Sequence, residues 1–344
     1  MTETPRRLSA RWALGVLLLS VVASVILGMA FGAVTIPISE TVSSLLGRGA
    51  EIEGAASVHR LIIREIRLPR VLLGFLVGSA LAISGATMQG IFRNPLASPY
   101  VLGIASGAST GAALVAVMGW AAVPFLPLGA FLGGLLAAGL VYGLARARGS
   151  RRTSVFTLIL AGVAVGALFS AITSFMVFLS SKGERMADIV FWIMGGLGRA
   201  NWADVGILAP IVGVGTLIIL AMARDLDALA LGEEGAFHLG VDPGRSARVL
   251  LATTALLTAA AVAFAGTIGF VGLIVPHIVR LVLGPRHRLL LPASALAGGI
   301  FLAWADVAAR TVMRPTELPV GIVTAFLGAP FFLFLLKRRA GGLR

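Results

Sequence analysis

Long apolar runs separated by short polar connections occupy almost the whole chain. A helix that crosses roughly 30 Å of hydrocarbon needs about 20 apolar residues. Runs of about this length lie at residues 12–34, 68–91, 98–118, 122–144, 155–180, 203–223, 246–268, 270–284, 289–312 and 317–336. The pattern predicts an all-α, polytopic membrane protein with about ten transmembrane helices, in which residues 1–344 form a single transmembrane domain.

Two of these runs depart from the simple pattern. The first, 12–34, follows arginines as a signal peptide would, but it is longer than a signal-peptide core and is predicted to be an uncleaved span. The run at 270–284 is short, and irregular backbone survives at membrane depth only where protein or water satisfies it. We expect a re-entrant or broken helix there, interrupted at Gly266, Gly269, Gly272 and Pro276.

Composition supports the membrane assignment and excludes several chemistries. The 344 residues are 58% hydrophobic and 12% charged, with a mean hydropathy of +0.98, and a soluble fold cannot bury that much apolar surface. The absence of cysteine excludes disulfides and thiolate metal sites. Neither lysine, Lys182 or Lys337, belongs to a phosphate-binding GxxxxGK[ST] loop, so any ATP must be hydrolysed by another chain. The histidines lie in separate segments without metal-ligand spacing: His59, His238, His277 and His287.

The formal charge of +13 is concentrated in connections between the apolar runs. Arginines that flank spans act as orientation signals, and they form no basic stripe with interleaved aromatics, so we expect no nucleic-acid partner. With the N-terminus inside, the inner connections are the more basic, and both termini are predicted to be cytoplasmic. Several arginines nevertheless fall on the outer side, namely Arg60, Arg64, Arg67, Arg70, Arg310 and Arg314.

The longest cytoplasmic connection contains a structured segment at 225–240. Asp225 caps a short helix whose Leu226, Leu229 and Leu231 share a face, and Gly232 separates it from a second short helix that ends at Gly240. Such a pair is a knob that a cytosolic protein could grip. The alternative is an interfacial helix pair lying on headgroups, which the acidic residues Asp227, Glu233 and Glu234 oppose because the inner leaflet is anionic.

Four long stretches resemble one family of membrane proteins. They are RLPR with GSALAISGATMQGIFRNPLASPYVLGIASGAS at 67–109, LALGEEGAFHLGV at 229–241, GTIGFVGLIVPHIVRL at 266–281 and ELPVGIVTAFLGAPFFLFLL at 317–336. They are similar to the permease subunit of type II ABC importers, which move iron–siderophore, haem and cobalamin. The resemblance implies the type II permease fold, a second permease copy as a homodimer partner, two ATPase subunits that bind ATP and magnesium, and a periplasmic or lipid-anchored substrate-binding protein.

The resemblance also assigns roles to individual positions. The segment 225–240 becomes the helix pair that couples to the ATPase, through Asp225, Leu229, Leu231, Gly232, Glu233, Glu234, Ala236 and Gly240. Arg67, Arg70 and Arg310 become exposed partners of acidic residues on the binding protein, although they could instead anchor helix ends to headgroups. Asp306 precedes Arg310 by four residues and could pair with it on one helix face.

A cytoplasmic gate is implied at two places. Asn94, Pro95 and Leu96 follow the second span, where a plain helix–loop–helix turn is the alternative. The start of the fifth span, with Thr153 and Thr157, is the other candidate, although Val155 and Phe156 replace the small polar residues expected there.

The resulting prediction is a transport subunit of the cytoplasmic (inner) membrane of a prokaryote, with no catalytic residues, metal site or bound cofactor of its own. Separate ATPases would drive alternating access for an iron chelate, with iron–siderophore favoured and haem or cobalamin as alternatives. A secondary transporter driven by an ion gradient would need a buried ionisable residue in mid-span. Asp306 is the one plausible residue of that kind, and it lies near the outer end of its span.

Overall fold

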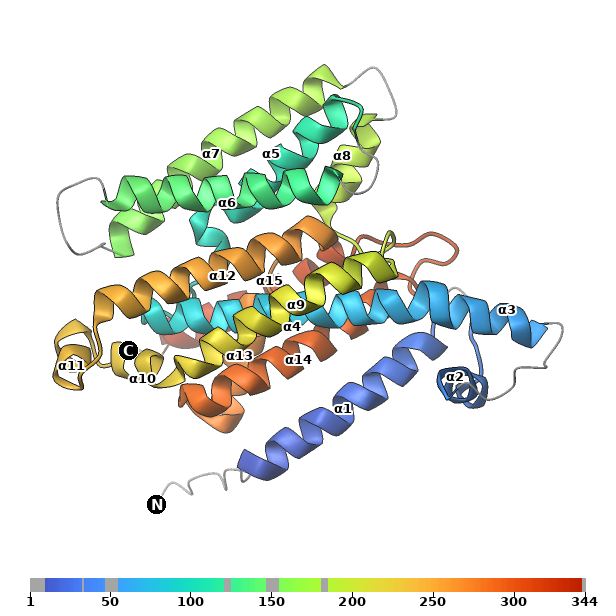
Figure 1. Ribbon diagram of the computed structural model, residues 1–344, viewed down its shortest axis with the longest axis horizontal. Coiled ribbons are helices and arrows are strands. Elements are labelled where there is room, and N and C mark those ends of the chain that lie inside the picture. Colours follow the sequence, from blue (N-terminus) through green and yellow to red (C-terminus); the bar gives the residue numbers. More distant parts are fainter. Residues whose placement is uncertain are drawn as a thin grey trace.

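The computed structural model describes residues 10–32, 34–46, 55–120, 125–146, 155–180 and 185–341, and every regular element in these ranges is helical (Figure 1). Among the described residues, seven helices are long and apolar enough to cross a membrane. Three shorter apolar helices, Ile104–Val117, Val271–Leu283 and Val320–Leu335, correspond to the three remaining predicted runs. The predicted all-α polytopic fold is confirmed.

The helices at the ten predicted runs are α1 (Ala10–Ala30), α4 (Leu68–Ile91), α5 (Ile104–Val117), α6 (Phe125–Arg146), α7 (Val155–Leu179), α9 (Trp202–Ala221), α12 (Pro243–Ala265), α13 (Val271–Leu283), α14 (His287–Ala309) and α15 (Val320–Gly341). Shorter helices connect them: α2 (Ile38–Leu45), α3 (Ala55–Leu61), the π-helix η1 (Ile62–Arg67), the 3₁₀ helix η2 (Pro99–Leu102), α8 (Arg185–Met194), α10 (Ala223–Leu229) and α11 (Glu233–His238). The hydropathy pattern did not reveal α2, α3 or α8, because they are too short to cross a membrane.

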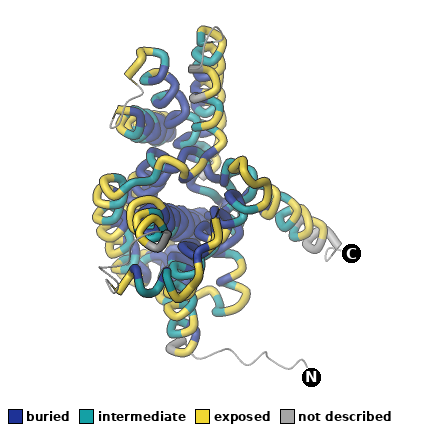
Figure 2. The backbone as a smooth tube through the Cα atoms, turned by 90° about the vertical axis from the view of Figure 1, so that its right-hand side faces the viewer, coloured by how far each residue is buried: buried dark blue, intermediate teal, exposed yellow. Residues whose placement is uncertain are grey.

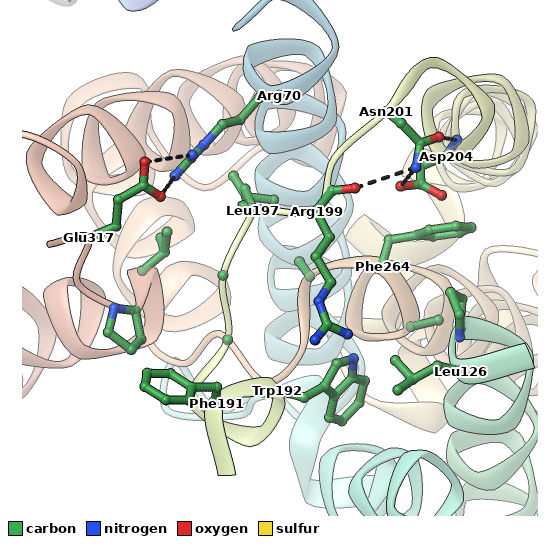
Figure 3. Close-up of a pocket in the computed structure, with 18 of the residues that line it drawn as sticks. Arg70, Leu126, Phe191, Trp192, Leu197, Arg199, Asn201, Asp204, Phe264 and Glu317 are labelled. Atoms are coloured by element: carbon green, nitrogen blue, oxygen red, sulfur yellow. Dashed lines mark hydrogen bonds and ion pairs between the residues drawn. The ribbon is translucent and has the colours of Figure 1, made fainter. Parts of the chain in front are cut away.

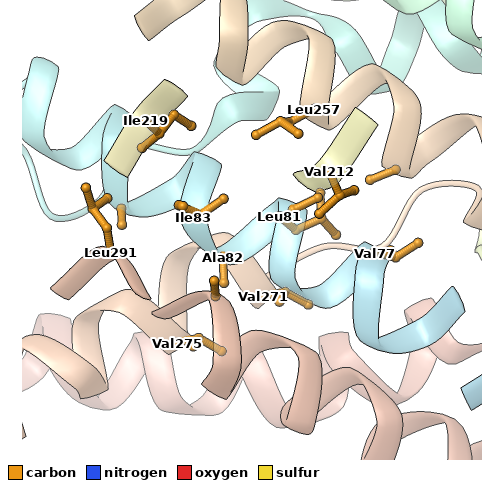
Figure 4. Close-up of a cluster of buried hydrophobic side chains, with 14 of the residues drawn as sticks. Val77, Leu81, Ala82, Ile83, Val212, Ile219, Leu257, Val271, Val275 and Leu291 are labelled. Carbon is orange, nitrogen blue, oxygen red and sulfur yellow. The ribbon is translucent and has the colours of Figure 1, made fainter. Parts of the chain in front are cut away.

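Helix α4 lies at the centre of the molecule, packed against α9, α12, α13 and α14. Its apolar side chains fill the core shown in Figure 4 together with residues of those helices. Glycines allow the backbones to touch: a Cβ atom at Gly78 would overlap the carbonyl oxygen of Gly298 on α14, and one at Gly85 would overlap that of Gly272 on α13. Close approach of this kind maximises van der Waals contact, which drives helix association in lipid.

Helices α5, α6 and α7 form a second group, which lies above the α4 group in Figure 1 and contacts it mainly between α6 and α12. Here too glycine faces glycine, with Gly107 of α5 against Gly133 of α6 and Gly111 against Gly129. The small residues of α4 and α5 therefore pack backbone against backbone. Figure 2 shows buried positions gathered inside and exposed ones outside, on helices whose exposed side chains are largely apolar.

The chain between α12 and α13 is not helical, as the glycines there predicted. Gly266 and Phe270 adopt positive φ values of +67° and +68°, and α13 begins directly afterwards. Gly272 and Pro276 lie inside α13 and do not break it, so that part of the prediction is wrong. A proline at this position cannot donate to the carbonyl of Gly272, and the side-chain amide of Gln89 on α4 donates to that oxygen instead, at 3.3 Å.

The molecule has two functional ends, which lie at opposite ends of its long axis in Figure 1. We call the end that carries α10 and α11 the coupling end, and the end that carries Arg67, Arg70 and Arg310 the arginine end. Helix α1 begins toward the coupling end (Figure 1). Under the predicted topology the coupling end faces the cytoplasm.

Replacing Gly85 tests the glycine packing of α4. Gly85→Ala places a methyl group against the backbone of α13, and overpacking of this kind costs about 1–3 kcal/mol. We expect a lower thermal unfolding midpoint in detergent. Gly139→Ala is the matched control, because a Cβ at Gly139 on α6 meets no atom within 4 Å. Equal midpoints for the two variants would contradict the role given to this contact.

Candidate functional site: a coupling helix pair, a gate loop and an arginine cluster

The helix pair at the coupling end has a buried base and an exposed apolar tip. Leu226 and Leu229 of α10 are buried in the main core, whereas Leu231, Phe237 and Leu239 are 69%, 72% and 63% exposed. Leu231 therefore does not share the buried face with Leu226 and Leu229, because the helix has already ended at Leu229. An exposed apolar tip on a packed base is typical of a protein–protein contact.

The remaining predicted coupling residues shape this tip. Gly232 separates the helices with a φ of +100°, which a residue with a side chain rarely adopts, and Gly240 has a φ of +80°. Glu233 and Glu234 are exposed in the first turn of α11, and Ala236 is buried beneath it. The tip therefore presents apolar and acidic groups side by side.

Two aspartates hold α10 to neighbouring helices. The carboxylate of Asp225 accepts a hydrogen bond from the Ser246 hydroxyl of α12 at 2.6 Å. Asp227 Oδ1 accepts from the backbone N–H of His287 at 3.0 Å and lies 2.7 Å from its Nδ1. Asp242 caps α12 through the backbone N–H groups of Gly244 and Arg245. These bonds tie the helix pair to α12 and α14, so it moves with them.

The predicted gate residues Asn94, Pro95 and Leu96 lie in a loop of residues 92–98, the gate loop, between α4 and η2. Asn94 Oδ1 accepts the backbone N–H of Leu96 at 2.9 Å, an Asx turn. Arg93, just before it, has a φ of +50°. The loop is bonded back to α4, since the N–H of Asn94 donates to the carbonyl of Gln89 at 3.2 Å.

The second candidate gate is only partly described. Thr153 lies outside the described residues, and Thr157 is half-buried in the first turn of α7. Helix α7 does pack against η2, because a Cβ at Gly162 would overlap the carbonyl oxygen of Val101. The two candidate gate segments are therefore attached to neighbouring elements, but no role as a gate follows from this packing alone.

A cluster of charged side chains lies at the arginine end. Asp306 of α14 lies between two arginines, 2.9 Å from Arg70 Nη2 and 3.1 Å from Arg310 Nε. Arg70 also pairs with Glu317 at 2.9 Å. Arg67 instead binds backbone carbonyls at and just after the end of α1, donating to Met29 at 2.6 Å and Ala30 at 3.0 Å and also to Val34.

The expected exposure of Arg67, Arg70 and Arg310 is wrong, because they are only 5%, 7% and 4% exposed. The physical reason is that carbonyls at the end of α1 and the carboxylate of Asp306 need partners where water is scarce. The pairing of Arg310 with Asp306, four residues earlier, is confirmed. Contact of these arginines with a binding protein stays a prediction; of the outer arginines, Arg64 and Arg314 are exposed.

A cavity of about 250 Å³ adjoins this cluster. In Figure 3, Arg70 and Glu317 lie on one side, Asn201 and Asp204 on another, and Phe191 and Trp192 toward the α8 side. The side-chain Oδ1 of Asn201 caps α9 by accepting a hydrogen bond from the backbone N–H of Asp204 at 3.0 Å. No local sequence pattern predicts this cavity, since its walls come from five separate segments.

A second, more open cavity of about 480 Å³ is lined almost wholly by small and hydroxyl residues: Tyr100, Ala105, Ser106, Ser109, Ser170, Thr173, Ser174, Ile193, Thr267 and Gly269. No charged side chain is among these described lining residues. The serines and threonines of α5 and α7 recur at helical spacing of three and four, which is a signal present in the sequence.

Most of these hydroxyl groups donate their proton to backbone carbonyl oxygens of the chain itself. Ser109, Thr173 and Ser174 each donate to the backbone carbonyl four residues earlier at 2.9 Å, and the Tyr100 hydroxyl donates to the carbonyl of Ile268 at 2.8 Å. A hydroxyl has one proton and two lone pairs. The lining therefore offers mainly hydrogen-bond acceptors to whatever enters the cavity.

The described part of the chain contains no group of three or more histidine and acidic side chains that could hold a metal ion. His287 binds Asp227, and His59 lies 2.8 Å from Glu40.

The fold and these sites define a polytopic membrane permease with a protruding helix pair for a partner. Comparison with known proteins identifies the family. Residues 18–338 match the FecCD transport family, and the chain belongs to it. It is thus a permease subunit of an ABC importer, and a multi-pass membrane protein.

Individual relatives agree with this assignment. The chain is 51% identical over 286 residues to a cobalamin import system permease protein of Halobacterium salinarum, covering 83% of this chain and 76% of the relative. It is 42% identical to a hemin transport system permease protein of Yersinia pestis, covering 80% and 83%. A solved inward-facing metal-chelate type ABC transporter matches with a TM-score of 0.82 and 31% identity, covering 95% of this chain and 99% of that chain.

Two carboxylates that share Arg70 provide a test of the arginine cluster. Asp306 is 1% exposed and Glu317 is 43% exposed as side chains. Removing one partner of a buried ion pair costs about 3–5 kcal/mol, whereas an exposed pair contributes about 0–1 kcal/mol. We therefore expect Asp306→Asn to lower the thermal unfolding midpoint and the yield strongly, and Glu317→Gln to change them little. A larger effect of Glu317→Gln would show that the cluster is not organised around Asp306.

Proposed function

We propose that this chain forms the translocation path of an ATP-driven importer of metal chelates in the cytoplasmic membrane of a prokaryote. The observation that carries the proposal is the exposed apolar tip of Leu231, Phe237 and Leu239 on a helix pair bonded to α12 and α14. Such a tip is matched to a cleft in a motor subunit, which would bind ATP and magnesium. A second copy of the permease would complete the path as a homodimer.

In this mechanism, ATP binding moves the helix pair and tilts the two permease copies, so that access alternates between the two faces of the membrane. The gate loop and the start of α7 close the path on the coupling side. A substrate-binding protein delivers the chelate at the arginine end. Since Arg67, Arg70 and Arg310 are buried, we expect its acidic residues to meet the exposed Arg64 and Arg314, with modest effects on affinity and larger ones on association rate.

Transport driven by an ion gradient is disfavoured by the state of Asp306. A coupling carboxylate must gain and lose a proton or cation during transport. The carboxylate of Asp306 is held between two guanidinium groups, at 2.9 and 3.1 Å, and its oxygens are occupied by these ion pairs. It is a structural residue in this arrangement.

The hydroxyl-lined cavity favours a neutral chelate with many hydrogen-bond donors, such as an amide-rich corrinoid. Its lining supplies acceptors and, among the described lining residues, no cation, so it offers nothing to the carboxylates of haem or ferric citrate, whose burial without partners is costly. The similarity to a cobalamin permease supports this choice. A neutral chelate takes the place of the iron–siderophore complex that the sequence motifs favoured. A neutral iron–siderophore complex remains compatible with this cavity.

Phe237 tests the contact with the motor. Truncating a central aromatic contact costs at least about 2 kcal/mol, or a factor of about 30 in affinity. We expect Phe237→Ser to lose co-purification with the cognate ATPase subunit and ATP-driven uptake, while membrane insertion and yield stay normal. Phe237→Leu, which keeps an apolar side chain, should retain most of both. Uptake by the serine variant at the rate of the unchanged chain would overturn the proposed coupling role.

The substrate is tested with the complete importer in proteoliposomes. We expect ATP-dependent uptake of cyanocobalamin, and uptake of haemin and ferric citrate at least about ten-fold lower, equivalent to about 1.4 kcal/mol. A neutral ferric hydroxamate is also tested, because it carries iron without net charge. Its uptake separates the effect of the substrate's charge from the effect of its metal. Preferred uptake of haemin or ferric citrate would exclude the neutral-chelate assignment and leave the importer mechanism standing.

A further inference from the structure

The helix pair and the gate loop lie in contact, although they are separated by more than a hundred residues of sequence. Helix α10 packs against both α4 and α14. Arg93 Nη1, from the gate loop, lies 3.4 Å from the position that a Cβ would take on Gly232. Leu226 Cδ2 of α10 lies 3.1 Å from the corresponding position on Gly90, in the last turn of α4. The helix pair therefore touches the chain on both sides of Phe92, through Leu226 of α10 and through the turn at Gly232.

His287, the first residue of α14, lies at the centre of this contact and is 4% exposed. Its Nδ1 and its backbone N–H both face Asp227 Oδ1 of α10, so the Nδ1 proton is assigned to that bond and Nε2 points the other way. Nε2 lies 2.8 Å from the position of a Cβ on Gly90. The imidazole ring is thus wedged between the carboxylate of α10 and the backbone of α4.

The wedge fits only because residue 90 is glycine. A side chain there would displace the imidazole or Leu226. Within the described residues, Nε2 of His287 is buried with no hydrogen-bond partner, an arrangement that stability alone does not favour. The ring is held by α10 on one side and is free of bonds to α4 on the other, so it can push on α4 without being tied to it.

The gate loop begins two residues beyond Gly90 and is bonded to the same turn of α4. The N–H of Arg93 donates to the carbonyl of Gly90 at 3.3 Å, and the N–H of Asn94 to that of Gln89. Close-packed groups of this kind transmit displacement, because an interior has little free volume to absorb it. Movement of α10 would therefore displace the end of α4 and the gate loop together.

We propose that Asp227, His287 and Gly90 form the mechanical link through which the coupling helix pair moves the gate loop. His287 acts as a positioning residue: Asp227 orients its ring, and the ring bears on α4. This inference rests on the proposed function, since it assumes that a motor moves α10 and that residues 92–98 form a gate.

The chain contains no cysteine, so a single Leu96→Cys substitution allows a spin label to be placed on the gate loop of the reconstituted importer. Two readouts are followed: the change in label mobility on adding ATP, and the number of chelate molecules imported per ATP hydrolysed. A purely structural defect lowers the amount of folded complex but leaves this ratio unchanged.

Asp227→Ala removes the orienting carboxylate, and Asp227→Asn keeps an oxygen that can accept both hydrogen bonds. We expect Asp227→Ala to lower import per ATP about ten-fold, within the usual range of coupling between sites, and to abolish the ATP response of the label. Asp227→Asn should retain most of both. His287→Gln, whose amide approximates the position of Nε2 but not that of Nδ1, should behave like Asp227→Ala.

An unchanged ratio and a normal label response in Asp227→Ala would overturn the link. Where that variant yields too little complex, Gly90→Ala probes the same contact from α4, and an unchanged ratio there has the same consequence. Absence of any ATP response in the labelled chain with Asp227 and His287 intact would instead refute the proposed function, and the link with it.

Discussion

Close backbone contact between helices is the constraint on which the whole structure depends. Lipid chains are as apolar as leucine, so the hydrophobic effect gives helices little reason to leave lipid for one another. The helices must therefore associate through close van der Waals packing of complementary surfaces. Gly78 and Gly85 let α4 touch α14 and α13 through their backbones, and α9 and α12 also pack against α4. The same device joins α5 to α6 through Gly107 and Gly133.

Close contact also creates polar groups that water cannot reach. The Met29 carbonyl in the last turn of α1 and the carbonyl opposite Pro276 would be left without these partners, and an unsatisfied group costs several kcal/mol in a hydrocarbon environment. Long side chains from α4 or the residue before it satisfy both: Arg67 binds the carbonyls of Met29 and Ala30, and Gln89 binds that of Gly272. These polar residues therefore belong to the scaffold, and their burial follows from the packing around α4.

The two ends of the molecule use charge in different ways. At the arginine end, Asp306 gathers Arg70 and Arg310 into a buried cluster that joins α4 to α14. At the coupling end, Asp225 and Asp227 hold a short helix pair against α12 and α14 and leave its apolar tip exposed. At the first end the charged groups pair with one another and are buried, and at the second they attach the helix pair to the spans, as the proposed coupling requires.

The sequence by itself determined the spans, because a helix must satisfy its backbone internally and be apolar over the thickness of the bilayer. It also determined the family and the glycine-linked helix pair, whose turn is local. The predicted cap is wrong, because α10 begins at Ala223 and the Asp225 carboxylate binds Ser246 of α12 instead of capping the helix. Tertiary structure alone decided that Arg67, Arg70 and Arg310 are buried, that the serines of α5 and α7 line one cavity, and that His287 lies between Asp227 and Gly90. Hydropathy and motif spacing report the environment along one helix. Whether a charged side chain is buried, or lines a site, depends on its neighbours from distant segments of the chain. A local sequence pattern does not identify those neighbours.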